Sequence, residues 1–325
     1  MSTPASQPVL VLDIGGTKIA AGIACPTRTG WAVAYSQKRA TPANDGGEAV
    51  LAQVIQAARD VAMIAEVDGV RPAACGIASA GVIDPATGAV TYASDLMPGW
   101  GGVDLARGVA QALGLPTFAL NDVHAHALGE AQFGAGQDAR RILVVAAGTG
   151  LGGALVVDGC VDQGACGIAG SIAHLPHPLA AGMRCACGST TGHIECVTSG
   201  TGQAALYNRN LPAGISPATG GGDVFRRHQA GDLYASAALS DSARALGQTL
   251  AGAAALLDPD RIVLTGSATR SGDGWWSALR AGFKGDALPL QSDVALVEGT
   301  LGGDAPLIGA AAWVRIRQTC AKPQI

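Results

Sequence analysis

Asp13-Ile14-Gly15-Gly16-Thr17-Lys18 follows an apolar run, residues 9–12, that is typical of a buried strand. A carboxylate, two glycines and a hydroxyl at one turn suit a phosphate group held by backbone N–H groups, because glycine lets the backbone approach an anion closely. Residues 19–23 again resemble a strand, so the stretch predicts a hairpin that binds phosphate. An ordinary Gly-Gly hairpin has the same pattern.

The side chains of this hairpin add further groups for a phosphate ligand. Thr17 and Lys18 supply a hydroxyl and a cation, and Asp13 can face a hydrated metal ion. The spacing differs from that of a Walker A loop, which needs Gly-x4-Gly-Lys-Ser/Thr.

A second glycine-rich hairpin, Gly148-Thr149-Gly150-Leu151-Gly152-Gly153, follows the apolar strand predicted at residues 141–147. It matches the dinucleotide fingerprint Gly-x-Gly-x-x-Gly, which alone would suggest an NAD-dependent oxidoreductase. A Rossmann loop must open a helix, however, and residues 154–157 are typical of a strand. A second phosphate loop fits better, and we expect the two hairpins to hold one nucleotide from opposite sides.

Length and composition point to a globular protein with a large core. The chain has 325 residues, of which 48% are hydrophobic and 14% charged, so it can form one large domain or two. The net charge of −4 argues against a nucleic-acid or anionic-membrane partner. The chain begins without the basic start of a secretory signal, and no apolar run approaches the ~20 residues of a membrane helix. We therefore expect a soluble, cytoplasmic protein.

The order of the predicted elements indicates an α/β fold, because a strand-rich start is followed by alternating strands and helices. In the first half we expect strands at 9–12, 19–24, 31–36, 74–78 and 117–120, and helices at 48–63 and 103–113. In the second half we expect strands at 141–147, 154–157 and 261–264, an Asp158-Gly159 turn, and helices at 199–207, 233–257 and 304–314. Residues 219–222 resemble a surface loop.

Asn121-Asp122 stands just past a predicted strand and at the start of a helix that runs to about Glu130. A helix N-terminus offers free N–H groups and partial positive charge, which favour an ionised Asp. Such a carboxylate can take the proton of a sugar hydroxyl as its bond to phosphorus forms. Asn-Asp is also an ordinary capping pair.

Cys185-Ala186-Cys187-Gly188 places two thiols one residue apart beside a glycine turn. His174, His177 and His193 lie within about ten residues on either side, and Zn²⁺ binds four Cys or His ligands as a tetrahedron. In a reducing compartment metal binding is favoured over a disulfide. The alternative is a pair of unconnected thiols with solvated histidines.

Taken together, these motifs resemble the ROK family of sugar kinases, and the resemblance covers nearly the whole chain in order. The matching segments are Asp13–Lys18, Asn121-Asp122 with Ala127-Leu128-Gly129-Glu130, Gly148–Gly153, and residues 259–266. The family implies an actin-like ATPase (ribonuclease H-like) fold with two α/β lobes and a cleft between them. We expect a small lobe of residues 1–121 plus 306–325 and a large lobe of residues 122–305.

The resemblance also implies a reaction: transfer of the γ-phosphoryl group of ATP, with Mg²⁺, to a hexose or N-acyl-hexosamine, usually at O6. It implies Asp122 as the catalytic base, a homodimer, and a structural Zn²⁺. The residues implied to bind the sugar are Asn121, Asp122, His174, Glu195 and Gly81. Those implied to bind ATP are Asp13, Gly15, Gly16, Thr17, Lys18, Gly148, Thr149, Gly150, Gly152 and Gly266.

This chain departs from the family pattern around the zinc loop. Ser171 stands where the family has a sugar-binding Glu, His193 replaces a cysteine ligand, and the loop 188–192 is one residue longer. A His in place of Cys remains a competent ligand, so we expect His174, Cys185, Cys187 and His193 to hold the metal. His177 and Cys196 are the reserves.

Ser171 bears on the substrate. A smaller, neutral residue leaves room beside the sugar, which favours an N-acyl-hexosamine such as N-acetylmannosamine over glucose. A glucokinase and a sugar-binding regulator without catalysis are the alternatives, and the sequence leaves open whether ATP or polyphosphate is the preferred donor.

Overall fold

The computed structural model describes residues 7–320, which form two compact units. The first unit contains the chain up to Asp138, then Ala154–Ala169, and the chain from Thr300 onward. The second contains Ala139–Gly153 and Gly170–Gly299.

The first sheet has the strand order β3-β2-β1-β4-β7. Its strands are β1 (Val9–Ile14), β2 (Lys18–Pro26), β3 (Trp31–Ala40), β4 (Ala74–Ser79) and β7 (Thr117–Asn121). β1, β4 and β7 are parallel, whereas β2 is antiparallel to both of its neighbours. In register, Asp13 pairs with Ala78, and Ser79 pairs with Asn121. The carboxyl ends of the parallel strands therefore bring Asp13 and Asn121 to the same edge of the sheet.

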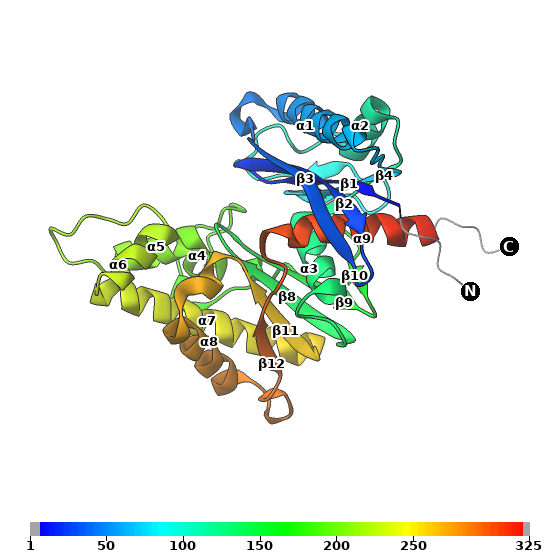
Figure 1. Cartoon of the computed structure of the whole chain (residues 1–325). Helices are drawn as coiled ribbons and strands as arrows, with labels where there is room; N and C mark the ends of the chain where they lie inside the picture. Colours follow the sequence, from blue (N-terminus) through cyan, green and yellow to red (C-terminus); the bar gives the residue numbers. More distant parts are fainter. Residues whose placement is uncertain (1–6, 321–325) are drawn as a thin grey trace. The chain divides into compact units, whose positions relative to one another are not determined.

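Helices cover both faces of this sheet (Figure 1). α1 (Gly47–Val67) and α2 (Leu105–Leu113) pack over the face that carries Leu10, Leu12 and Ile14. α9 (Ala305–Cys320) covers the opposite face. Side chains alternate along a strand, so Asp13 projects from the face that α9 covers.

α9 also packs against α3 (Asp122–Phe133), and glycines make this contact possible. A Cβ atom added at Gly309 would lie 1.7 Å from the carbonyl oxygen of Ala125, and one at Gly129 would lie 2.4 Å from that of Ala305. One at Gly76 of β4 would lie 2.4 Å from the carbonyl oxygen of Ala310. The backbones of α9, α3 and β4 thus approach more closely than any side chain allows.

The second sheet has the order β10-β9-β8-β11-β12. Its strands are β10 (Cys160–Asp162), β9 (Leu151–Val157), β8 (Arg141–Ala147), β11 (Arg261–Thr265) and β12 (Ala295–Glu298). β8, β11 and β12 are parallel, like β1, β4 and β7. The glycine hairpin joins the first two strands in each sheet, so both hairpins occupy equivalent positions.

The helices of the second unit pack with β8, β11 and β12 into its main core. They are α4 (Glu195–Thr198), α5 (Gly200–Arg209), α6 (Gly221–Gln229), α7 (Leu233–Leu257) and α8 (Asp273–Asp286). α7 and α8 also meet at glycines: a Cβ at Gly247 would lie 2.1 Å from the carbonyl oxygen of Leu279. A short hairpin, β5 (Val82–Ile83) and β6 (Val90–Tyr92), belongs to the first unit.

The α/β class and most of the expected elements are confirmed, with small changes at their ends. The helix expected at 233–257 is α7, and Asp158 and Gly159 both have positive φ, as the expected turn requires. The loop expected at 219–222 is wrong in its second half, because α6 begins at Gly221. Its polar, glycine-rich start hides the helix, which contacts the core through Val224 and Phe225.

The bounds of the two compact units differ from those of the lobes we expected. Residues 122–138 lie in the first unit because α3 packs on α9 through the glycine contacts above. Residues 154–169 join them there, with Nε2 of His124 on α3 lying 3.1 Å from the carbonyl oxygen of Ala169. The division into an N-terminal and a larger lobe at residue 121 remains a prediction.

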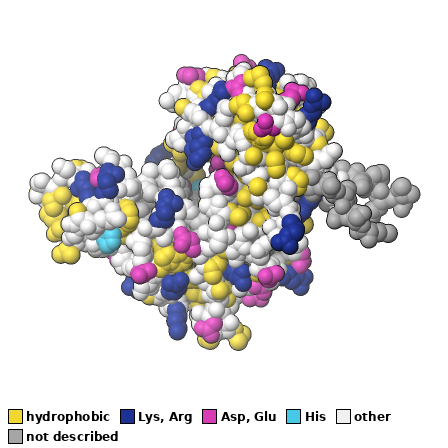
Figure 2. All heavy atoms as spheres, viewed as in Figure 1, with side chains coloured by type: hydrophobic (Ala, Val, Ile, Leu, Met, Phe, Trp, Pro, Cys, Tyr) yellow, Lys and Arg dark blue, Asp and Glu magenta, His cyan; other side chains and the backbone are white. Residues whose placement is uncertain are grey.

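The described surface shows no concentration of one charge on the face in Figure 2, where Lys and Arg alternate with Asp and Glu. Among residues 7–320, we find no helix with the length and apolar character that crossing a bilayer requires.

Candidate functional site

The turn of the first glycine hairpin is fixed by one backbone and one hydroxyl hydrogen bond. The N–H of Gly15 donates to the carbonyl of Lys18 at 3.0 Å, and the hydroxyl of Thr41 donates to the carbonyl of Gly15 at 2.6 Å. Neither Gly15 nor Gly16 has positive φ, and a Cβ on either would be at least 3.6 Å from its nearest neighbour. Folding therefore does not require glycine at these two positions. An anion that approaches the backbone closely would require it, because a side chain would stand in its way.

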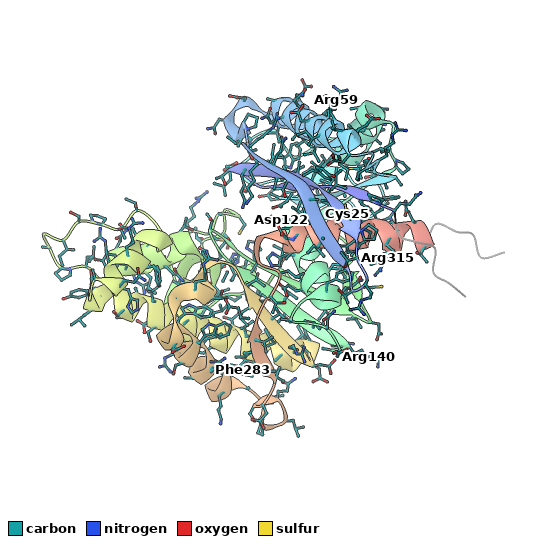
Figure 3. All side chains as sticks on the ribbon, viewed as in Figure 1. Cys25, Arg59, Asp122, Arg140, Phe283 and Arg315 are labelled. Atoms are coloured by element: carbon teal, nitrogen blue, oxygen red, sulfur yellow. The ribbon has the colours of Figure 1, made fainter. Side chains whose placement is uncertain are left out.

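Two carboxyl groups of the first unit interact electrostatically, Asp13 near the end of β1 and Asp122 at the start of α3. Figure 3 labels Asp122. Burial and, to a smaller extent, the negative charge of Asp122 together raise the pKa of Asp13 to about 7, although Lys18 and Lys38 oppose the shift. Burial also raises the pKa of Asp122, against the hydrogen bond that it accepts from the N–H of Val123 at 2.9 Å. The pair therefore favours a proton, a metal ion or a phosphorylated ligand with its cation.

Asn121 fixes the start of α3. Its side-chain oxygen accepts from the N–H groups of Val123 and His124, at 2.9 and 3.2 Å, and its amide donates to the carbonyl of Gly81 at 2.9 Å. Gly81 has φ +97°, and a Cβ there would lie 2.7 Å from the carbonyl oxygen of Tyr92. The capping pair expected from the sequence is present, and the Asn121 side chain also hydrogen-bonds the carboxylate of Asp122, which opposes the upward shift of the Asp122 pKa.

The second hairpin lies in the second unit, beside the glycine that ends β11. The N–H of Gly148 donates to the carbonyl of Gly150 at 2.9 Å, and a Cβ on Gly148 would meet nothing within 4 Å. Gly266 has φ +95°, and a Cβ there would lie 2.3 Å from the carbonyl oxygen of Ala147. Thr149 belongs to the same turn, and Gly152 follows in β9.

The N-terminus of α5 also reaches this hairpin, which the sequence did not predict. The N–H of Gly200 donates to the carbonyl of Gly148 at 2.8 Å, and the hydroxyl of Thr201 lies 3.5 Å from the carbonyl of Thr149. The side chain of Ser199 caps the helix by accepting from the N–H of Gly202. Ser199-Gly200 indicates the start of a helix in the sequence, but it does not indicate which segment that start contacts.

His174, Cys185, Cys187 and His193 form a compact group whose ligand atoms all lie within 4.8 Å of one another. Nδ1 of His174 is 3.7 Å from Sγ of Cys185, and Sγ of Cys187 is 3.4 Å from Nδ1 of His193. A bridge between Pro176 and His193 brings the two histidine-bearing segments together. These are the four residues expected from the sequence.

The donor set fits Zn²⁺. Two sulfurs and two imidazole nitrogens are a common structural set, and ligand atoms on a tetrahedral Zn²⁺ lie roughly 3.3–3.8 Å apart, as these pairs do. Without a cation, burial raises the pKa of Cys185 to about 12, so metal binding would displace its proton. Among the reserves, Nδ1 of His177 accepts instead from the N–H of Leu179 at 3.2 Å.

Glu195 connects this group to the second hairpin. One carboxylate oxygen accepts from the N–H of Leu151 at 3.3 Å, and the other lies 3.4 Å from Sγ of Cys185. A Cβ on Gly150 would be 3.1 Å from the same carboxylate. The second unit thus joins the hairpin, the Cys/His group and Glu195, while Ser171 precedes the short turn that carries His174.

The chain is similar to known proteins along nearly its whole length. The model of the ROK family matches residues 9–317. The glucokinase of Halalkalibacterium halodurans is 32% identical over 253 residues, 74% of each chain. The bifunctional enzyme NanE/NanK of Brucella melitensis biotype 1 is 31% identical over 315 residues, which cover 94% of this chain and 54% of that protein.

Solved structures agree with these matches. A ROK family glucokinase from Streptomyces griseus, in complex with glucose and AMPPNP, superposes with a TM-score of 0.80 at 28% identity. The match covers 95% of this chain and 99% of the other. The actin-like ATPase fold expected from the sequence is confirmed.

The shifted pKa of Asp13 predicts a pH dependence of stability. Between the unfolded pKa of 3.8 and about 7, the folded protein holds a proton that the unfolded chain has lost, so stability falls as pH rises through this range. Asp13→Asn removes this loss. We expect it to raise the unfolding midpoint of the ligand-free protein by at least about 2 °C at about pH 8, and less at about pH 5, in thermal scans.

Asp84→Asn is the control, because the pKa of Asp84 is shifted in the opposite direction to that of Asp13. Hydrogen bonds from Thr87 and Ala86 lower the pKa of Asp84, so its contribution to stability is present at neutral pH and is lost on acidification. Equal midpoints for Asp13→Asn and the unsubstituted protein across the pH range would contradict the assignment.

The Cys/His group predicts one bound zinc per chain after purification, as measured by elemental analysis. Cys187→Ser should lose most of this metal and lower the unfolding midpoint, because the loop 174–193 loses its cross-link. His177→Ala should keep the metal, since His177 lies outside the group. Equal metal loss in both variants would show that the ligand set is wrong.

Proposed function

The chain belongs to the ROK family, and we propose that it is an ATP-dependent kinase of a hexose or N-acyl-hexosamine. The observation that carries the proposal is the repeated plan of its two sheets, each with an open glycine hairpin between its first two strands. A carboxylate, Asp122, lies at the same sheet edge as the first of these hairpins. The comparison with a glucokinase that binds glucose and AMPPNP supports the same conclusion.

We propose that both hairpins bind phosphate groups of the nucleotide. In the first hairpin the N–H of Gly15 already donates to the carbonyl of Lys18, so Gly15 and Gly16 serve by letting the phosphate approach the backbone closely. Thr17 and Lys18 add a hydroxyl and a cation. The second hairpin would bind phosphate through Gly148, Thr149, Gly150 and Gly152. Gly266 lies next to this hairpin and would contact the nucleotide as well. Mg²⁺ that accompanies the nucleotide would offset the charge beside Asp13.

Asp122 acts in this proposal as the base that takes the proton of the sugar hydroxyl, O6 in a hexose. The backbone N–H of Val123 and the side chain of Asn121 hydrogen-bond its carboxylate, which orients the group before a sugar binds. Its raised pKa brings the carboxylate closer to the pH at which a base both stays ionised and accepts a proton well. Asn121, fixed by its cap, holds neighbouring hydroxyls.

The second unit supplies the remaining sugar contacts through His174 and Glu195. A zinc ion held by His174, Cys185, Cys187 and His193 would be structural, fixing the loop that presents both residues. Because Glu195 also contacts the N–H of Leu151, the sugar side and the phosphate hairpin share one carboxylate.

We further propose that N-acetylmannosamine is slightly preferred to glucose. Ser171 lies three residues before His174 and is exposed, so an N-acyl group meets a short neutral side chain there. The relatives include both a glucokinase and a NanE/NanK enzyme, and glucose is the alternative substrate. A sugar-binding regulator is the further alternative, to which the same Ser171 would point.

The first test concerns the base. Asp122→Asn should lower kcat for ADP release by a factor on the order of 10²–10⁴ while the sugar still binds in calorimetry, because only proton transfer is lost. Asp104→Asn, an exposed carboxylate at the start of α2, is the matched control and should retain full turnover. Near-normal turnover of Asp122→Asn would remove the residue from the mechanism, and no turnover by the unsubstituted protein with any hexose would favour the regulator.

The second test concerns the sugar. In a panel with ATP and Mg²⁺, we expect kcat/KM for N-acetylmannosamine to equal or exceed that for glucose. Ser171→Glu should shift the ratio toward glucose by about tenfold, through an added hydrogen-bond acceptor and lost space, whereas Ser171→Gln tests size without charge. A kcat/KM for glucose well above that for N-acetylhexosamines in the unsubstituted protein would defeat the preference.

A further inference from the structure

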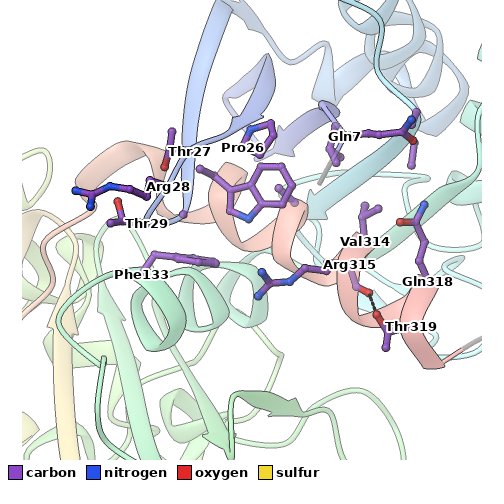
Figure 4. Close-up of a pocket in the computed structure, with 16 residues that line it drawn as sticks. Gln7, Pro26, Thr27, Arg28, Thr29, Phe133, Val314, Arg315, Gln318 and Thr319 are labelled. Carbon is purple, nitrogen blue, oxygen red and sulfur yellow. Dashed lines mark hydrogen bonds between the residues drawn. The ribbon is translucent and has the colours of Figure 1, made fainter. Parts of the chain in front are cut away.

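We propose that the first unit carries a second ligand site, separate from the glycine hairpin, that binds a small phosphorylated ring compound. The site is a pocket of about 940 Å³ (Figure 4). Its walls are the tip of the β2–β3 hairpin, the last turn of α3 and the outer turns of α9. This volume is within the range of small-molecule sites in proteins.

The pocket lies at the opposite edge of the sheet from Asp13 and Asp122. Val9 and Ala74, the first residues of β1 and β4, line it, whereas the phosphate hairpin follows the other end of β1. Five residues of strand separate Val9 from Ile14, which is roughly 16 Å. A ligand in this pocket therefore cannot touch the carboxylates of the proposed kinase site.

The charge of the pocket selects an anion. Arg28 and Arg315 are the charged residues among its described lining, and no carboxylate lines it. In the part of the chain that the structure describes, neither arginine forms an ion pair. Guanidinium groups bind phosphate through paired N–H donors, and the hydroxyls of Thr27 and Thr29 add further polar groups.

Arg315 is held in place before any ligand arrives. Its guanidinium donates to the side-chain oxygen of Gln132 at 2.9 Å and lies 5.7 Å from the ring centroid of Phe133. Figure 4 shows it projecting from α9 toward Phe133. A guanidinium that is already oriented loses less side-chain freedom on binding an anion.

The hairpin tip is also fixed, which makes the pocket a built feature of the fold. A Cβ on Gly30 would lie 2.8 Å from the ring of Phe133, so any larger residue would force that ring to shift, and glycine lets the tip pack directly on α3. The next residue, Trp31, is half-buried and lines the pocket. An indole face suits a planar base or the apolar face of a sugar ring. One anion and one ring thus define the ligand class, which a nucleoside monophosphate and a hexose phosphate share.

Ligand binding is measured at Trp31 itself, by fluorine NMR. Protein labelled with 5-fluorotryptophan contains five tryptophans, and Trp31→Phe identifies the fluorine resonance of Trp31. AMP, glucose 6-phosphate and inorganic phosphate are titrated separately. We expect AMP or glucose 6-phosphate to shift the Trp31 resonance saturably, at concentrations at least about tenfold below inorganic phosphate, and the better of the two identifies the ring.

Two arginine variants test the anion contact. Arg315→Gln and Arg28→Gln should each raise the apparent Kd at Trp31 by about tenfold, the loss expected for a charge-assisted hydrogen bond, and Arg28 lies on an exposed turn where folding tolerates the change. Arg107→Gln, on α2 and outside the pocket, should leave Kd unchanged. No saturable shift with either ring compound, equal binding of inorganic phosphate, or unchanged Kd in both arginine variants would overturn the proposal.

Discussion

The contact between the backbones of α3 and α9 is the constraint on which the first unit depends. Gly309 brings α9 so close to the carbonyl of Ala125 that even a methyl group would overlap it. Around this contact, the buried carboxylate of Glu130 accepts from the N–H groups of Thr300 and Leu301, at 3.0 and 2.9 Å, just before α9 begins. The helix that bears Asp122 is thereby tied to a segment about 180 residues further along the chain, and the position of the proposed base rests on that tie.

Local patterns predicted much of this fold, because strands and hairpins are encoded by neighbouring residues. The apolar run before Asp13 and the Gly-Gly turn define β1 and its hairpin without reference to anything distant. α7 was predicted at its full length because its apolar residues recur at helical spacing over seven turns. α8 was missed, since glycines and tryptophans near its start obscure its period, and its partner Gly247 lies far away in the sequence.

In the candidate site too, the features encoded by neighbouring residues were predicted and the long-range contacts were not. The Cys/His group was predicted because its ligands lie within twenty residues and their chemistry is distinctive. By contrast, the contact of Glu195 with the N–H of Leu151, and that of Gly200 with the carbonyl of Gly148, join segments about fifty residues apart through backbone groups. Backbone groups carry no residue-specific signal, so no motif reveals such contacts. The pocket around Trp31 and Arg315 was missed for a related reason: its walls come from three distant segments.

The late position of α9 also has a consequence for biosynthesis. The second unit lies within residues 139–299 and is synthesised before α9 begins. β1 and β4 are made earlier still, and α9 can pack on them only after it has been synthesised. Domains usually fold in the order in which they leave the ribosome. Here one face of the first sheet stays without its covering helix until residues 305–320 have been synthesised, so the first unit can complete its packing only after the second unit is made.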